Sequence, residues 1–160
     1  MIQIGFLSAW PPPAGNFNLA LCLVIFMAVV LDSRLAFWYA LGLGVGLEIF
    51  SLYPYGLILA GLILVVFLIN WLFSHFFTNR SFYSLMALGL VGVNFYYAWL
   101  LTGGTLAYLL KIISVGPELN RFYLLNLLWQ NVLQLILLAA AFLILNLTSR
   151  KLKTVFLIEE

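Results

Sequence analysis

An acidic residue at the end of an apolar stretch is the feature that most readily suggests chemistry. Glu48 occupies this position, after Gly42 and Gly46. A carboxyl group in a membrane-spanning helix is costly unless it is paired, protonated or solvated, so Glu48 could belong to a proton or ligand site. Because Glu48 also lies just before a turn, we favour the other interpretation, a hydrogen-bonding anchor at the membrane interface.

Small and turn-forming residues surround this acid. Gly42 and Gly46 are one helical turn apart, a spacing that lets another helix approach closely. Pro54 and Gly56 favour a turn after the acid. Together with Glu48, these four residues are candidates for a helix-packing or partner-binding surface.

A second set of polar side chains lies on the last apolar stretch. At intervals of four residues, three amides form one stripe along a helix: Asn126, Gln130 and Gln134. Asn131 is a neighbouring amide. Unsatisfied amides are expensive in hydrocarbon, so this stripe must face protein or water. It could line a small-molecule cavity, but we favour interhelical hydrogen bonds made through Asn70 and Asn94.

No familiar catalytic arrangement accompanies these side chains in the sequence. The chain has one histidine and one cysteine, and it has no zinc-protease motif, phosphate-binding glycine loop or serine elbow. His75, near the end of an apolar stretch, is interpreted as an interfacial anchor. We therefore expect a protein that is not an enzyme and that uses no cofactor or metal ion.

The elements that must position these residues are membrane helices. The chain is 66% hydrophobic and 8% charged, whereas an ordinary soluble domain is about 25% charged. A globule of this size would lack the polar side chains needed to cover its surface, but lipid accepts an apolar exterior. The sequence therefore predicts an all-α, polytopic membrane helix bundle.

Five spans and one interrupted segment make up a single membrane domain over residues 1–160. A short N-terminal segment, residues 1–15, precedes the spans. Residues 105–122 are apolar but are interrupted by charged residues, glycine and proline, so we expect an interfacial or re-entrant segment there, with a sixth span as the alternative. The predicted spans are approximately residues 16–31, 35–50, 56–77, 82–102 and 123–147.

Basic residues indicate the orientation of this domain. One side of the predicted topology carries Arg34, Arg80, Arg150, Lys151 and Lys153. The other side carries Lys111 and Arg121, so the first side is expected to be cytoplasmic, with the C-terminus inside and the N-terminus outside. The net charge of +2 is too small to indicate a nucleic-acid partner.

The stretch over residues 42–57, GLGVGLEIFSLYPYGL, resembles the bacterial rod shape-determining protein MreD family. Members of that family show a glycine-rich helix, an acidic residue, a short Ser/Pro turn and Gly-Leu opening the next span. Residues 18–21 are similar to the start of a span in that family, and residues 126–153 are similar to its last helix. The resemblance implies a bacterial cytoplasmic-membrane protein with the fold of the substrate-binding subunits of energy-coupling-factor vitamin transporters.

Two functions from different classes follow from this resemblance. The first is a non-enzymatic subunit of the cell-elongation machinery, which links scaffold, cytoskeletal filament and peptidoglycan synthesis. Its implied partners are membrane lipids, an MreC-like scaffold protein and other elongation-complex proteins. The alternative is a small-molecule-binding membrane subunit of a vitamin or nutrient transporter, in which Gln130 and Gln134 would face a pocket.

Overall fold

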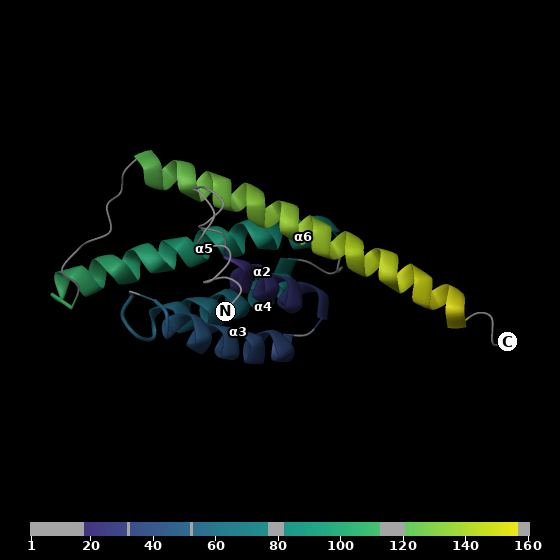
Figure 1. Ribbon diagram of the computed structural model, residues 1–160, viewed down its shortest axis with the longest axis horizontal. Coiled ribbons are helices and arrows are strands. Elements are labelled where there is room, and N and C mark those ends of the chain that lie inside the picture. Colours follow the sequence, from purple (N-terminus) through teal and green to yellow (C-terminus); the bar gives the residue numbers. More distant parts are fainter. Residues whose placement is uncertain (1–17, 32, 52, 77–81, 113–120, 157–160) are drawn as a thin grey trace.

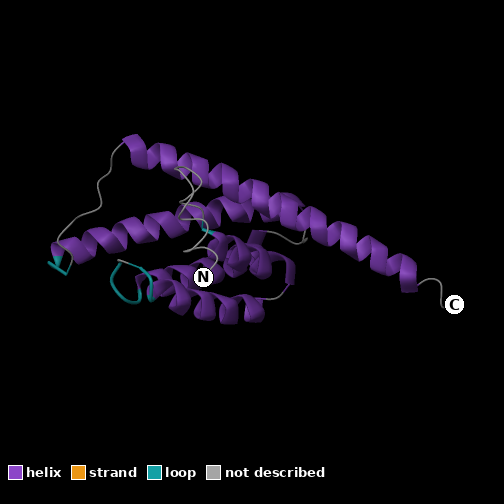
Figure 2. Ribbon diagram, in the orientation of Figure 1, coloured by secondary structure: helices purple, strands orange, loops and turns teal. Residues whose placement is uncertain are grey.

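The computed structural model describes residues 18–31, 33–51, 53–76, 82–112 and 121–156. Within these ranges the chain is helical and contains no strand (Figure 2), which confirms the all-α prediction. The elements in chain order are α2 (Leu19–Phe26), the π-helical turn η3 (Met27–Leu31), α3 (Ser33–Glu48), α4 (Leu57–Phe76), α5 (Phe82–Leu109) and α6 (Arg121–Phe156).

Helix α2 lies at the centre of the bundle and, among the described elements, contacts each of the helices α3, α4, α5 and α6 (Figure 1). Its N-terminus is capped by Asn18, whose side-chain Oδ1 accepts a hydrogen bond of 3.1 Å from the backbone N–H of Leu21. An Asn at this position satisfies one of the N–H groups that the first helical turn leaves unpaired. Leu21, Val24 and Ile25 are fully buried. A helix that is apolar on nearly all sides is expected to be enclosed in this way.

One hydrophobic core joins α2 to the helices around it. Helix α3 contributes only small buried side chains, Ala36 and Ala40, which allow its backbone to approach α2 and α4. The other fully buried aliphatic side chains among the described residues are Val29 of η3, Leu62, Val65 and Ile69 of α4, Leu85, Leu88 and Val93 of α5, and Leu138 of α6. Packing is therefore dense on α4 and α5 and sparse on α6.

Helix α6 packs mainly on α5, and its C-terminal part extends beyond the other helices (Figure 1). The contact with α5 uses a glycine, because a Cβ atom built at Gly89 would lie 2.5 Å from Leu138 Cδ1. Large apolar side chains on the rest of α6 are exposed, among them Leu128, Trp129 and Ile136. This helix therefore presents most of its apolar surface to whatever surrounds the protein.

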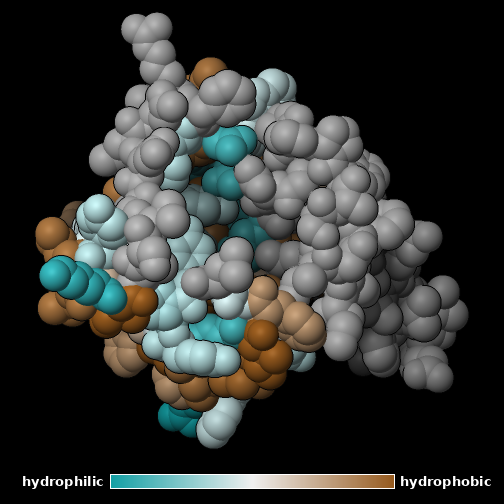
Figure 3. Space-filling model, turned by 60° about the vertical axis from the view of Figure 1, so that its left-hand side comes forward, coloured by the Kyte–Doolittle hydropathy of each residue, from teal (hydrophilic) through white to brown (hydrophobic). Residues whose placement is uncertain are grey.

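Among the described residues, three helical segments are long and apolar enough to cross a membrane: Leu57–Phe76, Phe82–Leu109 and Leu125–Asn146. At most 33% of the hydrophobic window of any of them is buried inside the protein. Brown, hydrophobic residues are exposed on the face of the molecule that Figure 3 shows. An apolar exterior of this kind is stable in lipid, so the fold is that of a membrane protein. The count of five spans and the transporter-like fold stay predictions.

Two helices continue past the ends that the sequence predicts. The predicted fourth span stops at residue 102, and a separate interfacial segment begins at 105, but α5 runs through Gly103 and Gly104 to Leu109. Glycine costs about 1 kcal/mol per residue in a helix, so neighbouring contacts must offset it. The other helix is α6, which ends at Phe156 rather than 147, because a helix need not stop where it leaves the membrane. The rest of the predicted interfacial segment, residues 113–120, lies outside the described residues.

Contacts within α5 and with α4 explain this continuation. The Trp99 indole N–H donates to the backbone carbonyl of Leu57 at 3.1 Å, and the Leu57 side chain occupies the space beside Gly103. Helix α5 then ends where Lys111 adopts a φ of 57°. The N–H of Ile112 donates to the carbonyl of Ala107 at 2.9 Å, which is the bond of a Schellman C-cap.

Candidate functional site

The glycine-bearing face of α3 points away from the rest of the bundle. A Cβ atom built at Gly42 or Gly46 would meet no atom of the described residues within 4 Å, and both glycines are exposed. Trp38 and Tyr39 lie beside them with exposed fractions of 69% and 48%. With Gly42 and Leu43 they line a groove of ≈ 280 Å³. We call these residues, Trp38, Tyr39, Gly42, Leu43 and Gly46, the glycine face.

Gly44, which lies between Gly42 and Gly46 in the sequence, makes the close contact with α4. A Cβ atom at Gly44 would lie 3.0 Å from Leu59 Cα, so only glycine lets α3 pack this closely on α4. The sequence pattern favoured Gly42 and Gly46 for a close helix approach. Within the described residues, no helix makes that approach at either position, and Gly44 carries the internal contact instead.

Glu48, Pro54 and Gly56 form the corner between α3 and α4. The backbone N–H of Leu59 donates to Glu48 Oε1 at 2.9 Å, so the carboxylate at the end of α3 caps the first turn of α4. The carbonyl of Pro54 accepts from the N–H of Leu57 at 3.2 Å, and Gly56 has a φ of 94°. A positive φ at the third residue of such a turn is what a glycine readily supplies. These three residues therefore have a structural role here, in agreement with the anchor interpretation of Glu48.

Tyrosines gather at the same end of the bundle. The Asn18 side chain forms a hydrogen bond with Tyr96, which is 2% exposed. The rings of Tyr96 and Tyr97 pack edge to face, with their centroids 5.5 Å apart. Tyr96 is not among the residues that the sequence pattern singles out. Its partner Asn18 could have been found from the sequence, because an Asn directly before an apolar run is a helix N-cap pattern.

The amides of α6 are partly paired with α5, as the interhelical interpretation expects. Asn94 Nδ2 donates to Asn131 Oδ1 at 3.1 Å, and each of these amides also donates to a carbonyl of its own helix. Asn131 was predicted only as a neighbour of the stripe, yet it makes this interhelical bond. Asn70, the other expected partner, is exposed on α4 and lines a different pocket.

The three predicted members of the stripe differ in burial. Asn126 and Gln130 are half-buried, and Gln134 is 3% exposed. The Nε2 atom of Gln134 has no hydrogen-bond partner among the described residues. A buried donor without an acceptor is costly and calls for an explanation. Gln134 is therefore the amide of the stripe whose buried polar group is not explained by the side chains around it.

His75 is an anchor at the end of α4. Its Nδ1 atom lies 2.9 Å from the Trp71 carbonyl, and its ring is stacked against Trp71 at a centroid distance of 5.0 Å. Over the described ranges, no group of three His, Cys, Asp or Glu side chains is arranged to hold a metal ion.

The geometry thus separates two kinds of candidate residue. Glu48, Pro54, Gly56 and the paired amides hold the helices together, whereas no described residue covers Gly42 and Gly46 of the glycine face. No family model, curated protein or solved structure matches this chain.

Proposed function

We propose that this protein is a non-enzymatic subunit of the bacterial cell-elongation machinery in the cytoplasmic membrane, with its C-terminus on the cytoplasmic side. In this function it links an MreC-like scaffold protein to the cytoskeletal filament and to peptidoglycan synthesis. Two observations support the proposal. One is the resemblance of residues 42–57 to the MreD family, and the other, which carries the structural argument, is the open glycine face of α3.

The glycine face has the features of a helix-docking surface. In a membrane, helices associate by close packing rather than by the hydrophobic effect, and small residues one turn apart allow the closest approach. Gly42 and Gly46 have that spacing, and the space above them is open in the described structure. Trp38 and Tyr39 border the groove and offer large, rigid contact area. A helix of the scaffold protein is the proposed occupant.

Affinity capture of the scaffold protein tests this function. The tagged protein is co-expressed with the MreC-like scaffold, extracted in detergent and captured. A Gly42→Ile, Gly46→Ile variant should retain roughly tenfold less scaffold, a loss of about 1.4 kcal/mol, because the new side chains prevent close approach. The bundle should remain folded, since both positions are open.

A matched control places the same side chain at small, exposed positions of another helix. Ala87 and Ala98 of α5 are exposed, so Ala87→Ile, Ala98→Ile should capture scaffold like the wild type. Equal capture by the glycine variant would contradict the docking surface. A wild-type protein that captures no scaffold would contradict the proposed function itself.

One observation favours the alternative function, a small-molecule-binding transporter subunit. The buried Nε2 donor of Gln134 lacks an acceptor within the described ranges, and a polar ligand between the helices could supply one. Mass spectrometry of the purified protein separates the two functions. A bound vitamin-sized compound that is lost in Gln134→Leu, together with co-purification of an ATPase module, would favour transport.

A further inference from the structure

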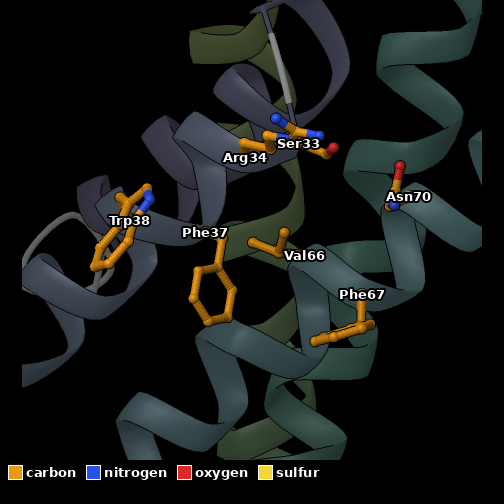
Figure 4. Close-up of a pocket in the computed structure, with 7 residues that line it drawn as sticks. All are labelled: Ser33, Arg34, Phe37, Trp38, Val66, Phe67 and Asn70. Carbon is orange, nitrogen blue, oxygen red and sulfur yellow. The ribbon is translucent and has the colours of Figure 1, made fainter.

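A second groove, distinct from the glycine face in its chemistry, lies between the start of α3 and the last turns of α4. Its volume is ≈ 290 Å³. In Figure 4 the polar residues Ser33, Arg34 and Asn70 lie at one end, and Phe37 and Phe67 lie beyond them. The polarity therefore changes along the groove, from a cationic end to an aromatic end.

The change in polarity follows the positions of the lining residues along α3 and α4. Arg34 is the second residue of α3, and Phe37 and Trp38 come one turn further into the helix. On the antiparallel neighbour, Asn70 is nearer the end of α4 than Phe67. The polar end thus lies at the start of α3 and is nearer the end of α4 than the aromatic end is. Phe67, with an exposed fraction of 64%, offers apolar surface to a lipid chain.

We infer that this groove binds one anionic phospholipid, with its phosphate at Arg34 and Asn70 and one acyl chain along Phe37 and Phe67. Such a lipid site goes beyond the proposed function and needs only that the protein resides in a bilayer. A guanidinium has five N–H donors in a planar fork and binds phosphate in two-point contacts, so it can hold a phosphate in addition to another partner. Basic pockets between membrane helices are known to bind anionic headgroups.

The volume of the groove and the positive charge of Arg34 indicate which kind of lipid it binds. A groove of this size is at the lower end of the range for ligand pockets, about 300 Å³, and suits a headgroup with the upper part of one chain. A zwitterionic lipid would bring its own cation to the site of Arg34, whereas an anionic lipid presents net negative charge. The orientation expected from the basic residues would place this end in the cytoplasmic leaflet, which carries anionic lipid.

Lipid retention by the delipidated protein tests this inference. Phosphatidylglycerol or phosphatidylcholine with identical acyl chains is added, and bound lipid is counted by native mass spectrometry. The wild type should bind phosphatidylglycerol roughly fivefold better, which corresponds to about 1 kcal/mol. Arg34→Gln should bring the ratio near one. Phe67→Ala, at an exposed position, should lower the binding of both lipids and leave the ratio unchanged.

Controls distinguish this lipid site from nonspecific attraction of anions, from a free-phosphate site and from a protein-binding groove. Lys111→Gln removes an exposed charge near the end of α5 and should leave the preference intact. Free glycerol phosphate should not displace the lipid, because it has no chain. The inference is overturned if Arg34→Gln keeps the preference, if Lys111→Gln loses it equally, or if glycerol phosphate competes. It is also overturned if Arg34→Gln leaves lipid binding intact but lowers capture of the scaffold protein, because the groove then holds a protein partner.

Discussion

Glu48 and Leu59 are joined by a hydrogen bond of 2.9 Å from the Leu59 backbone N–H to the Glu48 carboxylate, so the end of α3 caps the start of α4. The N-terminus of a helix carries partial positive charge and unpaired N–H groups, and a carboxylate there satisfies both. An acid that the sequence places in a costly environment thus has a structural partner eleven residues away.

Replacement of Glu48 should therefore lower the stability of the protein, and the loss should be larger when both the acceptor oxygen and the charge are removed. Glu48→Ala loses both acceptor and charge and should cost about 1–2 kcal/mol, whereas Glu48→Gln keeps an acceptor oxygen and should cost about 0.5 kcal/mol. Thermal unfolding in detergent, followed by circular dichroism, measures both. Glu48→Ala with wild-type stability would show that the cap is unimportant.

Two glycines should respond oppositely to alanine. At Gly61 a Cβ would lie 2.9 Å from Trp99 Cδ1 and 3.0 Å from Tyr96 Cε2, so Gly61→Ala should cost about 1–3 kcal/mol through overpacking. The rings cannot easily move, because Tyr96 is buried and Trp99 is bonded to Leu57. Gly42→Ala meets open space and should leave stability unchanged or raise it by up to about 1 kcal/mol. Denaturant unfolding of both variants gives the comparison, and equal losses would contradict the packing.

The amide pair between α5 and α6 should show a measurable coupling energy. A double-mutant cycle with Asn94→Leu and Asn131→Leu should give about 0.6 kcal/mol and at most about 1.7 kcal/mol. The coupling is modest because each amide retains a bond to a carbonyl of its own helix. Asn70→Leu, at an exposed position on α4, serves as the control and should be additive with Asn94→Leu. Additive behaviour of the Asn94 and Asn131 variants would argue against the bond.

Two positions with positive φ should have opposite responses to substitution. Gly56 has a φ of 94°, so Gly56→Ala should destabilise the α3–α4 corner by about 1–2 kcal/mol. Lys111 has a φ of 57° at the end of α5, so Lys111→Gly should stabilise the protein by roughly 1 kcal/mol. Melting temperatures of the two variants should therefore shift in opposite directions. A shift of both in the same direction would contradict these backbone angles.

Local sequence patterns predicted the elements well where a helix is defined by its own residues. Long apolar runs and turn residues located α4 and the start of α5, because these depend on neighbours in the chain. The end of α5 was missed, because Trp99 and Leu57 are far apart in sequence and their contact lets the helix continue through Gly103. No local pattern indicates that contact.

The sequence alone indicated that the protein is surrounded by lipid and that its fold is helical. Both conclusions depend on the overall composition of the chain and on the length of its apolar runs. Only the tertiary structure decided which glycine faces which surface. Residues two apart on a helix point about 200° apart, so Gly44 lies opposite Gly42 and Gly46. The rotation of α3 about its axis selects the buried one, and packing against α2 and α4 sets that rotation. This nonlocal packing placed Gly44 against Leu59 and left Gly42 and Gly46 open.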